Sequence, residues 1–265
     1  AMGNRVLEPG ATIGVLGGGQ LGRMLACTAA KLGLKCHIYC DEENAPAYEV
    51  AAAHTVGAYD DAKALKSFAE SVDVATVEFE NVPAEALAAV GASTAVYPPP
   101  KALEVSQDRL IEKRFAQDLG IPVAPHHDIT SADDLKAAVA ALGTPALLKT
   151  RRLGYDGKGQ VRIADDTDLD DAYASLKGAP ALLEKFVDFE CEISIIAARG
   201  VDGDLACYDV SQNLHRNQVL AEARVPANVP NGISLDAQKM VRALAEALDY
   251  RGVLCVELFY CGEAA

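Results

Sequence analysis

The sequence has little positive charge, no CxxC cysteine pair and no long hydrophobic run. Its 24 Lys and Arg residues stand against 38 Asp and Glu, a formal net charge of −14 that argues against general nucleic-acid binding. No apolar stretch approaches the roughly 18 residues of a membrane span. The start, Ala1-Met2-Gly3, lacks the basic and apolar regions of a signal peptide and is typical of a tag remnant. We therefore expect neither a nucleic-acid nor a membrane partner.

The seven cysteines form no CxxC pair. Their odd number and their scatter through apolar segments are typical of reduced, mostly buried thiols. Half of the residues are hydrophobic and 23% are charged, which is ordinary for a globular enzyme. Together these features predict a cytoplasmic protein without a disulfide framework.

The first hundred residues alternate between strand and helix patterns, which predicts a doubly wound parallel sheet. The expected strands are 12–16, 35–40, 55–56 and 74–79, and the expected helices are 20–32, 62–71 and 83–90. The three prolines at 98–100 cannot continue a helix and mark a boundary. This part, residues 1–105, is predicted to be one domain.

The remaining chain predicts an α+β arrangement. Helices are expected at 107–119, 133–142, 168–176 and 235–248, and strands at 146–149, 161–163, 181–186, 191–198, 205–210 and 252–259. We divide it into domains at 106–187 and 188–265. His126 and His127 follow a proline in a connector and are interpreted as surface residues.

One stretch, KTRRLGYDGKGQ at 149–160, is rich in glycine and basic residues although the protein is acidic. Glycines allow close backbone approach, and cations beside exposed N–H groups form an anion cradle. The motif GK[ST] of a P-loop is absent, so a hairpin lid over nucleotide phosphates fits better. Lys149 would lie on a rigid strand and Lys158 at the tip. The alternative is a solvated surface hairpin.

A second glycine motif, Gly17-Gly18-Gly19-Gln20-Leu21-Gly22, lies between a strand and a helix. With Asp41 at the end of the next strand, it matches the pattern of a nicotinamide dinucleotide site. Such a turn also binds other phosphorylated ligands at a helix N-terminus, or serves packing alone. The polar side chains of Gln20 and Arg23 would extend toward a ligand bound at this turn.

Three further positions suggest ligand contacts. The segment Glu184-Lys185-Phe186-Val187 ends a strand as an adenine-binding edge would, and Glu192 could accept ribose hydroxyls. His215 is as consistent with a structural histidine as with a ligand. Glu257 lies in an apolar run, where a carboxylate is costly unless it is paired or bound to metal. A Mg²⁺ ligand and an internal ion pair are both possible there.

Together these motifs resemble the ATP-grasp superfamily, and within it the 5-(carboxyamino)imidazole ribonucleotide synthase family. The resemblance covers the chain from about residue 11 and rests on five stretches: IGVLGGGQLGRML at 13–25, EFENVP at 78–83, QDR at 107–109, GYDGKGQ at 154–160 and NLH at 213–215. It implies a parallel-sheet pre-ATP-grasp domain followed by an ATP-grasp fold. It also implies a ligase that uses ATP, Mg²⁺ and bicarbonate to carboxylate 5-aminoimidazole ribonucleotide through carboxyphosphate, in purine biosynthesis.

The resemblance also implies roles for individual residues. Tyr155, Asp156 and Lys158 would lie where carboxyphosphate and substrate meet, and Glu257 would bind Mg²⁺. The ribonucleotide would contact Gly19, Gln20, Leu21 and Glu78. The residues implied for ATP are Arg109, Lys149, Gly154, Tyr155, Asp156, Gly157, Lys158, Gly159, Gln160, Glu184, Lys185, Phe186, Val187, Glu192 and His215.

The family pattern continues past this chain with a second metal-binding glutamate and a substrate-phosphate lysine. We therefore expect either that a tail is omitted from the sequence or that the protein is truncated and inactive alone. The resemblance further implies a homodimer. Competing functions are another ATP-grasp carboxylate–amine ligase, a nicotinamide oxidoreductase and a nucleotide-binding fragment without catalysis.

Overall fold

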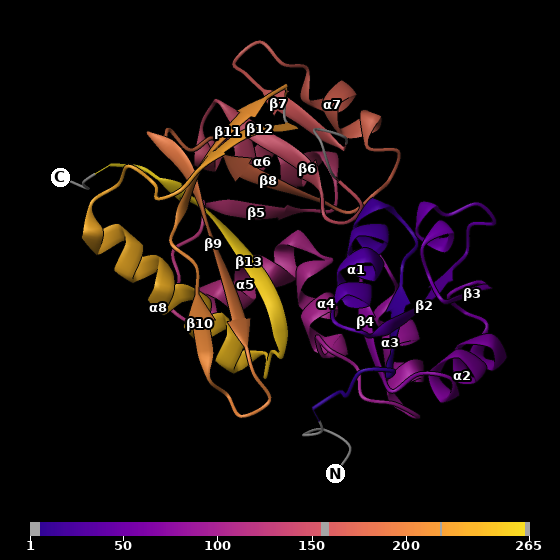
Figure 1. Ribbon diagram of the computed structural model, residues 1–265. Coiled ribbons are helices and arrows are strands. Elements are labelled where there is room, and N and C mark those ends of the chain that lie inside the picture. Colours follow the sequence, from indigo (N-terminus) through magenta and orange to yellow (C-terminus); the bar gives the residue numbers. More distant parts are fainter. Residues whose placement is uncertain (1–5, 155–158, 218, 263–265) are drawn as a thin grey trace. The chain divides into compact units, whose positions relative to one another are not determined.

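The computed structural model describes residues 6–154, 159–217 and 219–262, and these fall into two compact units (Figure 1). The first unit comprises the chain up to Glu104 with Arg199–Leu205 and Ala245–Val253. The second comprises Val105–Ala198, Ala206–Leu244 and the chain from Leu254 onward. No helix in the described ranges is both long and apolar enough to cross a membrane.

The first unit is built on a parallel sheet, as the alternating pattern predicted. Its strand order is β3 (Ala53–Val56), β2 (Lys35–Cys40), β1 (Thr12–Leu16) and β4 (Val74–Val77). The connecting helices are α1 (Gln20–Lys31), the short η1 (Pro46–Glu49), α2 (Ala62–Glu70) and α3 (Ala84–Gly91). The carboxyl ends of β1, β2 and β4 therefore meet at one edge of the sheet.

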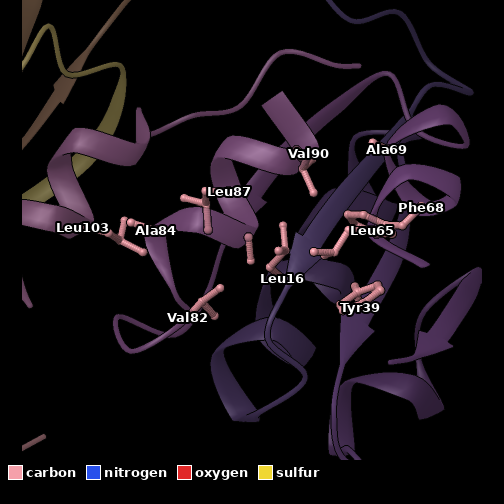
Figure 2. Packing of buried hydrophobic residues seen from close by; sticks show 12 residues of the cluster. Leu16, Tyr39, Leu65, Phe68, Ala69, Val82, Ala84, Leu87, Val90 and Leu103 are labelled. Carbon is pink, nitrogen blue, oxygen red and sulfur yellow. The ribbon is translucent and has the colours of Figure 1, made fainter. Parts of the chain in front are cut away.

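The core of this unit packs strand side chains against α2 and α3 (Figure 2). Tyr39, Leu65 and Phe68 are almost completely buried in it. Burial of each such side chain stabilises the fold by roughly 1.5–3 kcal/mol. Gly14 in β1 is required here, because a Cβ at this position would lie 2.7 Å from the Phe68 ring.

The second unit contains an antiparallel sheet of order β5 (His126–Ile129), β8 (Ala181–Lys185), β6 (Ala146–Thr150) and β7 (Gln160–Ile163). Helices α5 (Arg109–Asp118), α6 (Ala132–Leu142) and α7 (Leu169–Ser175) accompany it. Its core is made of buried aliphatic side chains from α6, α7 and the strands. Strands β6 and β7 pair as expected on either side of the glycine-rich stretch, with Lys149 opposite Gln160.

The last sheet has the order β10 (Leu205–Cys207), β9 (Cys191–Arg199), β11 (Ser211–Arg216) and β12 (Val219–Arg224), and β13 (Gly252–Tyr260) pairs with β9. Helix α8 (Asn231–Ala247) precedes β13. The expected strand at 205–210 is shorter than predicted, and β11 and β12 were not predicted. Neither strand alternates regularly between apolar and polar residues along its length, so the hydrophobic pattern did not mark them.

Three local features differ from what the sequence predicted. A helix, α4 (Pro100–Ser106), begins within the proline run, since proline is tolerated in a first helical turn. The helix expected from 107 begins instead at Arg109, because Asp108 caps it. His126 and His127 lie in β5 and pair with β8, not in a connector, although His127 is exposed and His126 partly exposed, as expected of surface residues.

The cysteines are free but not mostly buried, so that expectation was also wrong. Cys36 and Cys40 are buried, whereas three cysteines are exposed: Cys27, Cys255 and Cys261. The exposed strand face of β13 explains Cys255, which sequence hydrophobicity placed in a core.

Candidate functional site

A buried carboxylate with two lysines lies at the ends of β6 and β8. Glu184 is 7% exposed, and its Oε2 lies 2.5 Å from Nζ of Lys149. Its Oε1 contacts Nζ of Lys113, one turn after Arg109 on α5. Burial alone would raise the pKa of Glu184, but the positive charges of Lys149 and Lys113 hold it below its usual range. The carboxylate is therefore ionised and paired with both lysines.

Residues at the start of α5 form several hydrogen bonds with the segment that follows β6. Asp108 accepts hydrogen bonds from the guanidinium of Arg151, and the N–H of Arg109 donates to the carbonyl of Arg151. Arg152 donates to Gln107 at 3.0 Å. The contiguous residues 107–109 thus contact 151 and 152 at the base of the glycine-rich stretch.

Arg109, the predicted phosphate-binding arginine, takes part in the same set of hydrogen bonds. Nη2 of Arg109 donates to the carbonyl oxygen of Gly154 at 2.7 Å. Arg109 and Gly154 are therefore brought together.

The glycine-rich stretch is described only at its ends. Tyr155, Asp156, Gly157 and Lys158, which include all three predicted catalytic residues, lie outside the described residues. Gly159 has φ +68°, and a Cβ there would collide with the Thr150 hydroxyl. Glycine is thus required where the hairpin rejoins β7.

In the predicted adenine-binding segment, two backbone N–H groups are already hydrogen-bonded within the protein. The N–H groups of Lys185 and Phe186 donate to the carbonyls of Pro125 and Pro145. The Phe186 ring is half-exposed and lies under the guanidinium of Arg162, with 5.4 Å between Cζ and the ring centroid. Base recognition by this segment would therefore fall to carbonyl groups and to Val187.

Glu192 and His215 form a hydrogen-bonded pair between β9 and β11. Asn213 lies opposite Glu192 in the strand register, so His215, two residues on, shares its face. Asn213 is buried and donates to Ser194 at 3.0 Å, which holds this register. His215 therefore lies within a strand, not after one, and its ring is positioned by the carboxylate.

The pair lines a hollow of about 330 Å³. Its other lining residues include Phe189, Gln212 and Arg224. The Phe189 ring also stacks on Phe259 of β13, with centroids 4.5 Å apart. An aromatic wall beside hydrogen-bond acceptors suits a ligand with a flat ring and hydroxyl groups.

Glu257 is not buried, which corrects the premise of its prediction. Strand β13 alternates between partly buried and exposed residues, and Glu257 points to the exposed face. The carboxylate is therefore accessible, and no desolvation cost demands a metal. In the described ranges no group of three or more His, Cys, Asp and Glu residues could hold a metal ion. One accessible carboxylate still fits Mg²⁺ that takes its other ligands from phosphates and water.

In the first unit, Glu78 follows β4 and reaches into the turn between β1 and α1. A Cβ at Gly19 would lie 2.8 Å from Oε1 of Glu78, and one at Gly17 would collide with Oε2. A carboxylate therefore fills the space where a pyrophosphate would lie in a dinucleotide site. This arrangement disfavours a nicotinamide dinucleotide at the turn, and it also disfavours a phosphate group there. An amine or hydroxyl group of a ligand suits the carboxylate instead. Gln20 and Leu21 are exposed at the start of α1.

Sequence reasoning missed three residues of these clusters: Lys113, Asp108 and Arg151. The first lies four residues after Arg109 on the same helix, so helical spacing could have linked the two. Asp108 was part of the quoted motif at 107–109, but its capping and pairing roles were not recognised. Nothing local marked Arg151 as its partner.

Family models match most of the chain. The ribonucleotide synthetase preATP-grasp domain matches residues 10–107, and the ATP-grasp domain matches residues 114–265. The N5-carboxyaminoimidazole ribonucleotide synthase of Brucella melitensis is 48% identical over 255 residues, which cover 96% of this chain and 70% of that protein. The enzyme of the same name from Bacillus subtilis is 36% identical, with 97% of this chain and 68% of that protein covered.

Solved structures agree with these relatives. An ADP complex of an N5-carboxyaminoimidazole ribonucleotide synthetase superposes with a TM-score of 0.91 at 38% identity, covering 98% of this chain and 71% of that one. The Aspergillus clavatus enzyme in complex with ADP and 5-aminoimidazole ribonucleotide gives a TM-score of 0.87 at 29% identity. That match covers 97% of this chain and 68% of the other.

Proposed function

The chain belongs to the N5-carboxyaminoimidazole ribonucleotide synthase family of ATP-grasp ligases, and from this premise we propose how its residues divide the work. In this family ATP, used with Mg²⁺, drives the carboxylation of 5-aminoimidazole ribonucleotide in purine biosynthesis. We assign ATP to the clusters of the second unit and the ribonucleotide to the turn of the first.

The observation that carries the ATP assignment is the pair of partly buried lysines on Glu184. Lys149, Lys113 and Arg109 lie with the carboxylates of Glu184 and Glu112 near the end of β6, so three cationic groups gather beside the base of the glycine-rich stretch. Phosphate oxygens are the ligands that such a site prefers. Lys149 and Arg109 would therefore hold phosphates, with residues 154–160 over them.

The nucleoside part of ATP suits the hollow lined by Glu192 and His215. The Glu192 carboxylate would accept ribose hydroxyls, and His215 would keep it oriented. The segment Lys185, Phe186 and Val187 would contribute to the adenine side.

Mg²⁺ would be held by Glu257 together with phosphate and water oxygens. When bound, the ion neutralises negative charge on the phosphates during phosphoryl transfer. The accessible carboxylate on β13 supports this assignment.

The proposed reaction begins when a bicarbonate oxygen attacks the γ-phosphorus of ATP. The new P–O bond gives carboxyphosphate, and the bond to ADP breaks. The carboxyl carbon, as carboxyphosphate or as released CO₂, then bonds to the exocyclic amine, which loses a proton as phosphate leaves. Protein residues position the reactants and offset charge. Tyr155, Asp156 and Lys158 stay predicted for this step.

The ribonucleotide is assigned to Gly19, Gln20, Leu21 and Glu78. The support is the carboxylate of Glu78 in the turn, where it can accept a hydrogen bond from an amine or a hydroxyl group.

The test is ATP hydrolysis followed as phosphate release. Release should require both bicarbonate and 5-aminoimidazole ribonucleotide, and ADP should bind in a calorimetric titration. Release that ignores bicarbonate, or release with formate in its place, would contradict this function and favour another ATP-grasp ligase.

We also propose a homodimer in the cytoplasm, from the family resemblance and the free cysteines. Sedimentation equilibrium should give twice the mass of the chain, and a monomer at micromolar concentration would contradict the dimer.

A further inference from the structure

Three charged side chains from three elements meet in the second unit. Lys113 comes from α5, Glu184 from β8 and Lys149 from β6. Each lysine contacts a different oxygen of the same carboxylate. The side chains are 17%, 9% and 23% exposed, so water screens their charges only weakly. Arg109 and Glu112 are further charged groups on the same helix.

The presence of Lys113 affects whether Lys149 is able to bind a phosphate. A buried carboxylate with a single lysine would hold that lysine in a closed ion pair, because separating them leaves an unpaired buried charge. A phosphate would then have to compete with Glu184 for the ammonium group. With both lysines present, Glu184 keeps one partner when the other turns to a ligand.

We propose that Lys113 is a positioning residue for nucleotide binding: it satisfies Glu184 so that Lys149 can hold the nucleotide phosphates. This inference rests on the phosphate role proposed above for Lys149. Lys113 acts through Glu184 and does not itself contact the nucleotide.

The arrangement predicts a specific form of non-additivity. Removing the charge of Lys113 should leave Lys149 bound to Glu184 and weaken nucleotide binding. Removing the charge of Glu184 as well should free Lys149 again. A purely structural role of Lys113 would make the double change at least as damaging as the single one.

The experiment is a calorimetric titration of the whole chain with ADP and Mg²⁺. Lys113→Met should weaken ADP binding about tenfold or more, as loss of a charge-assisted contact does. Lys113→Met with Glu184→Gln should return to within about threefold of the unmodified protein. A matched control is Lys136→Met, whose exposed partner Asp170 is in the same unit, and ADP binding should not change.

Two outcomes would overturn the proposal: normal ADP binding by Lys113→Met, or a double variant as weak as the single one, which is expected if Lys113 itself held a phosphate. Lys149→Met distinguishes a failure of this proposal from a failure of the proposed function. Normal ADP binding by that variant would contradict the phosphate role of Lys149 itself. If Lys113→Met does not fold, Lys113→Gln keeps a donor without the charge. It must show the same loss and the same recovery with Glu184→Gln.

Discussion

Asp108 and Arg151 join the start of α5 to the end of β6. Nε of Arg151 lies 3.0 Å from Oδ1 of Asp108, and Nη2 lies 2.7 Å from Oδ2. The same Oδ1 accepts the N–H of Leu110 at 3.0 Å, so one carboxylate caps the helix and anchors the arginine. This bidentate geometry places Arg109 against the base of the glycine-rich stretch.

Asp108→Asn should lower the free energy of unfolding by about 2–3 kcal/mol, because it leaves the charge of Arg151 without its main partner. The effect should fall below that of a fully buried pair, since Arg151 also reaches Asp128. Urea denaturation measures it. Asp236→Asn, which breaks an exposed pair with Lys239, should change stability by less than about 0.5 kcal/mol. Equal losses in both variants would contradict the anchoring role.

Gly159→Ala should weaken ADP binding and lower the melting temperature. The left-handed backbone at this position costs a non-glycine residue about 1 kcal/mol, and the new Cβ would displace Thr150. Gly120→Ala is the matched control, because Gly120 has φ +74° but open space around its Cα. The control should also lower the melting temperature and leave ADP binding intact. Weaker ADP binding in both variants would show that the effect is general destabilisation.

Glu192→Gln should weaken ADP binding about tenfold while leaving pyrophosphate binding unchanged, because the carboxylate is assigned to ribose and not to phosphate. Competition titrations with both ligands measure this difference. Asp170→Asn alters an exposed residue outside this hollow, in the same unit, and should affect neither ligand. If ADP and pyrophosphate binding weakened equally, Glu192 would have to be assigned to the phosphate site and not to the ribose.

The melting temperature should fall as the pH drops from about 7 toward 5, partly because of His37. Burial, followed by the charge of His54, lowers the pKa of His37, whose ring nitrogens bond to Thr55 and Ser71. A lowered pKa in the folded state means that the stabilisation is present above the pKa of the unfolded chain, near 6.5, and is lost as the pH falls. His37→Gln should flatten this dependence, whereas His127→Gln at an exposed position should not. An unchanged slope in His37→Gln would exclude this residue as the cause.

Local patterns predicted much of the fold, because they depend on neighbours along the chain. The parallel sheet around Thr12–Leu16 and the hairpin that begins with Ala146–Thr150 follow from apolar runs and turn residues, and the structure confirms both. Strands such as Val219–Arg224 were missed, because apolar and polar residues do not alternate regularly along them; in the structure every residue of this strand is exposed.

Side-chain environments could not be predicted in the same way. Glu257 was expected to be buried because its neighbours are apolar, yet it lies on the open face of β13. Glu78 was expected near a ligand, but its position inside the turn depends on β4 lying beside β1. In each case the surroundings depend on which segments pack against the residue and not on its neighbours in the sequence.

The sequence by itself determined the family, the order of the elements and the chemical types at the two glycine motifs, since those are properties of residues and short spacings. Only the tertiary structure decided which charges meet. It placed Lys113 and Lys149 on one carboxylate, joined Asp108 to Arg151, and filled the first glycine turn with Glu78. The physical reason is that electrostatic pairing depends on distance and burial, and folding sets both by bringing together residues far apart in the chain.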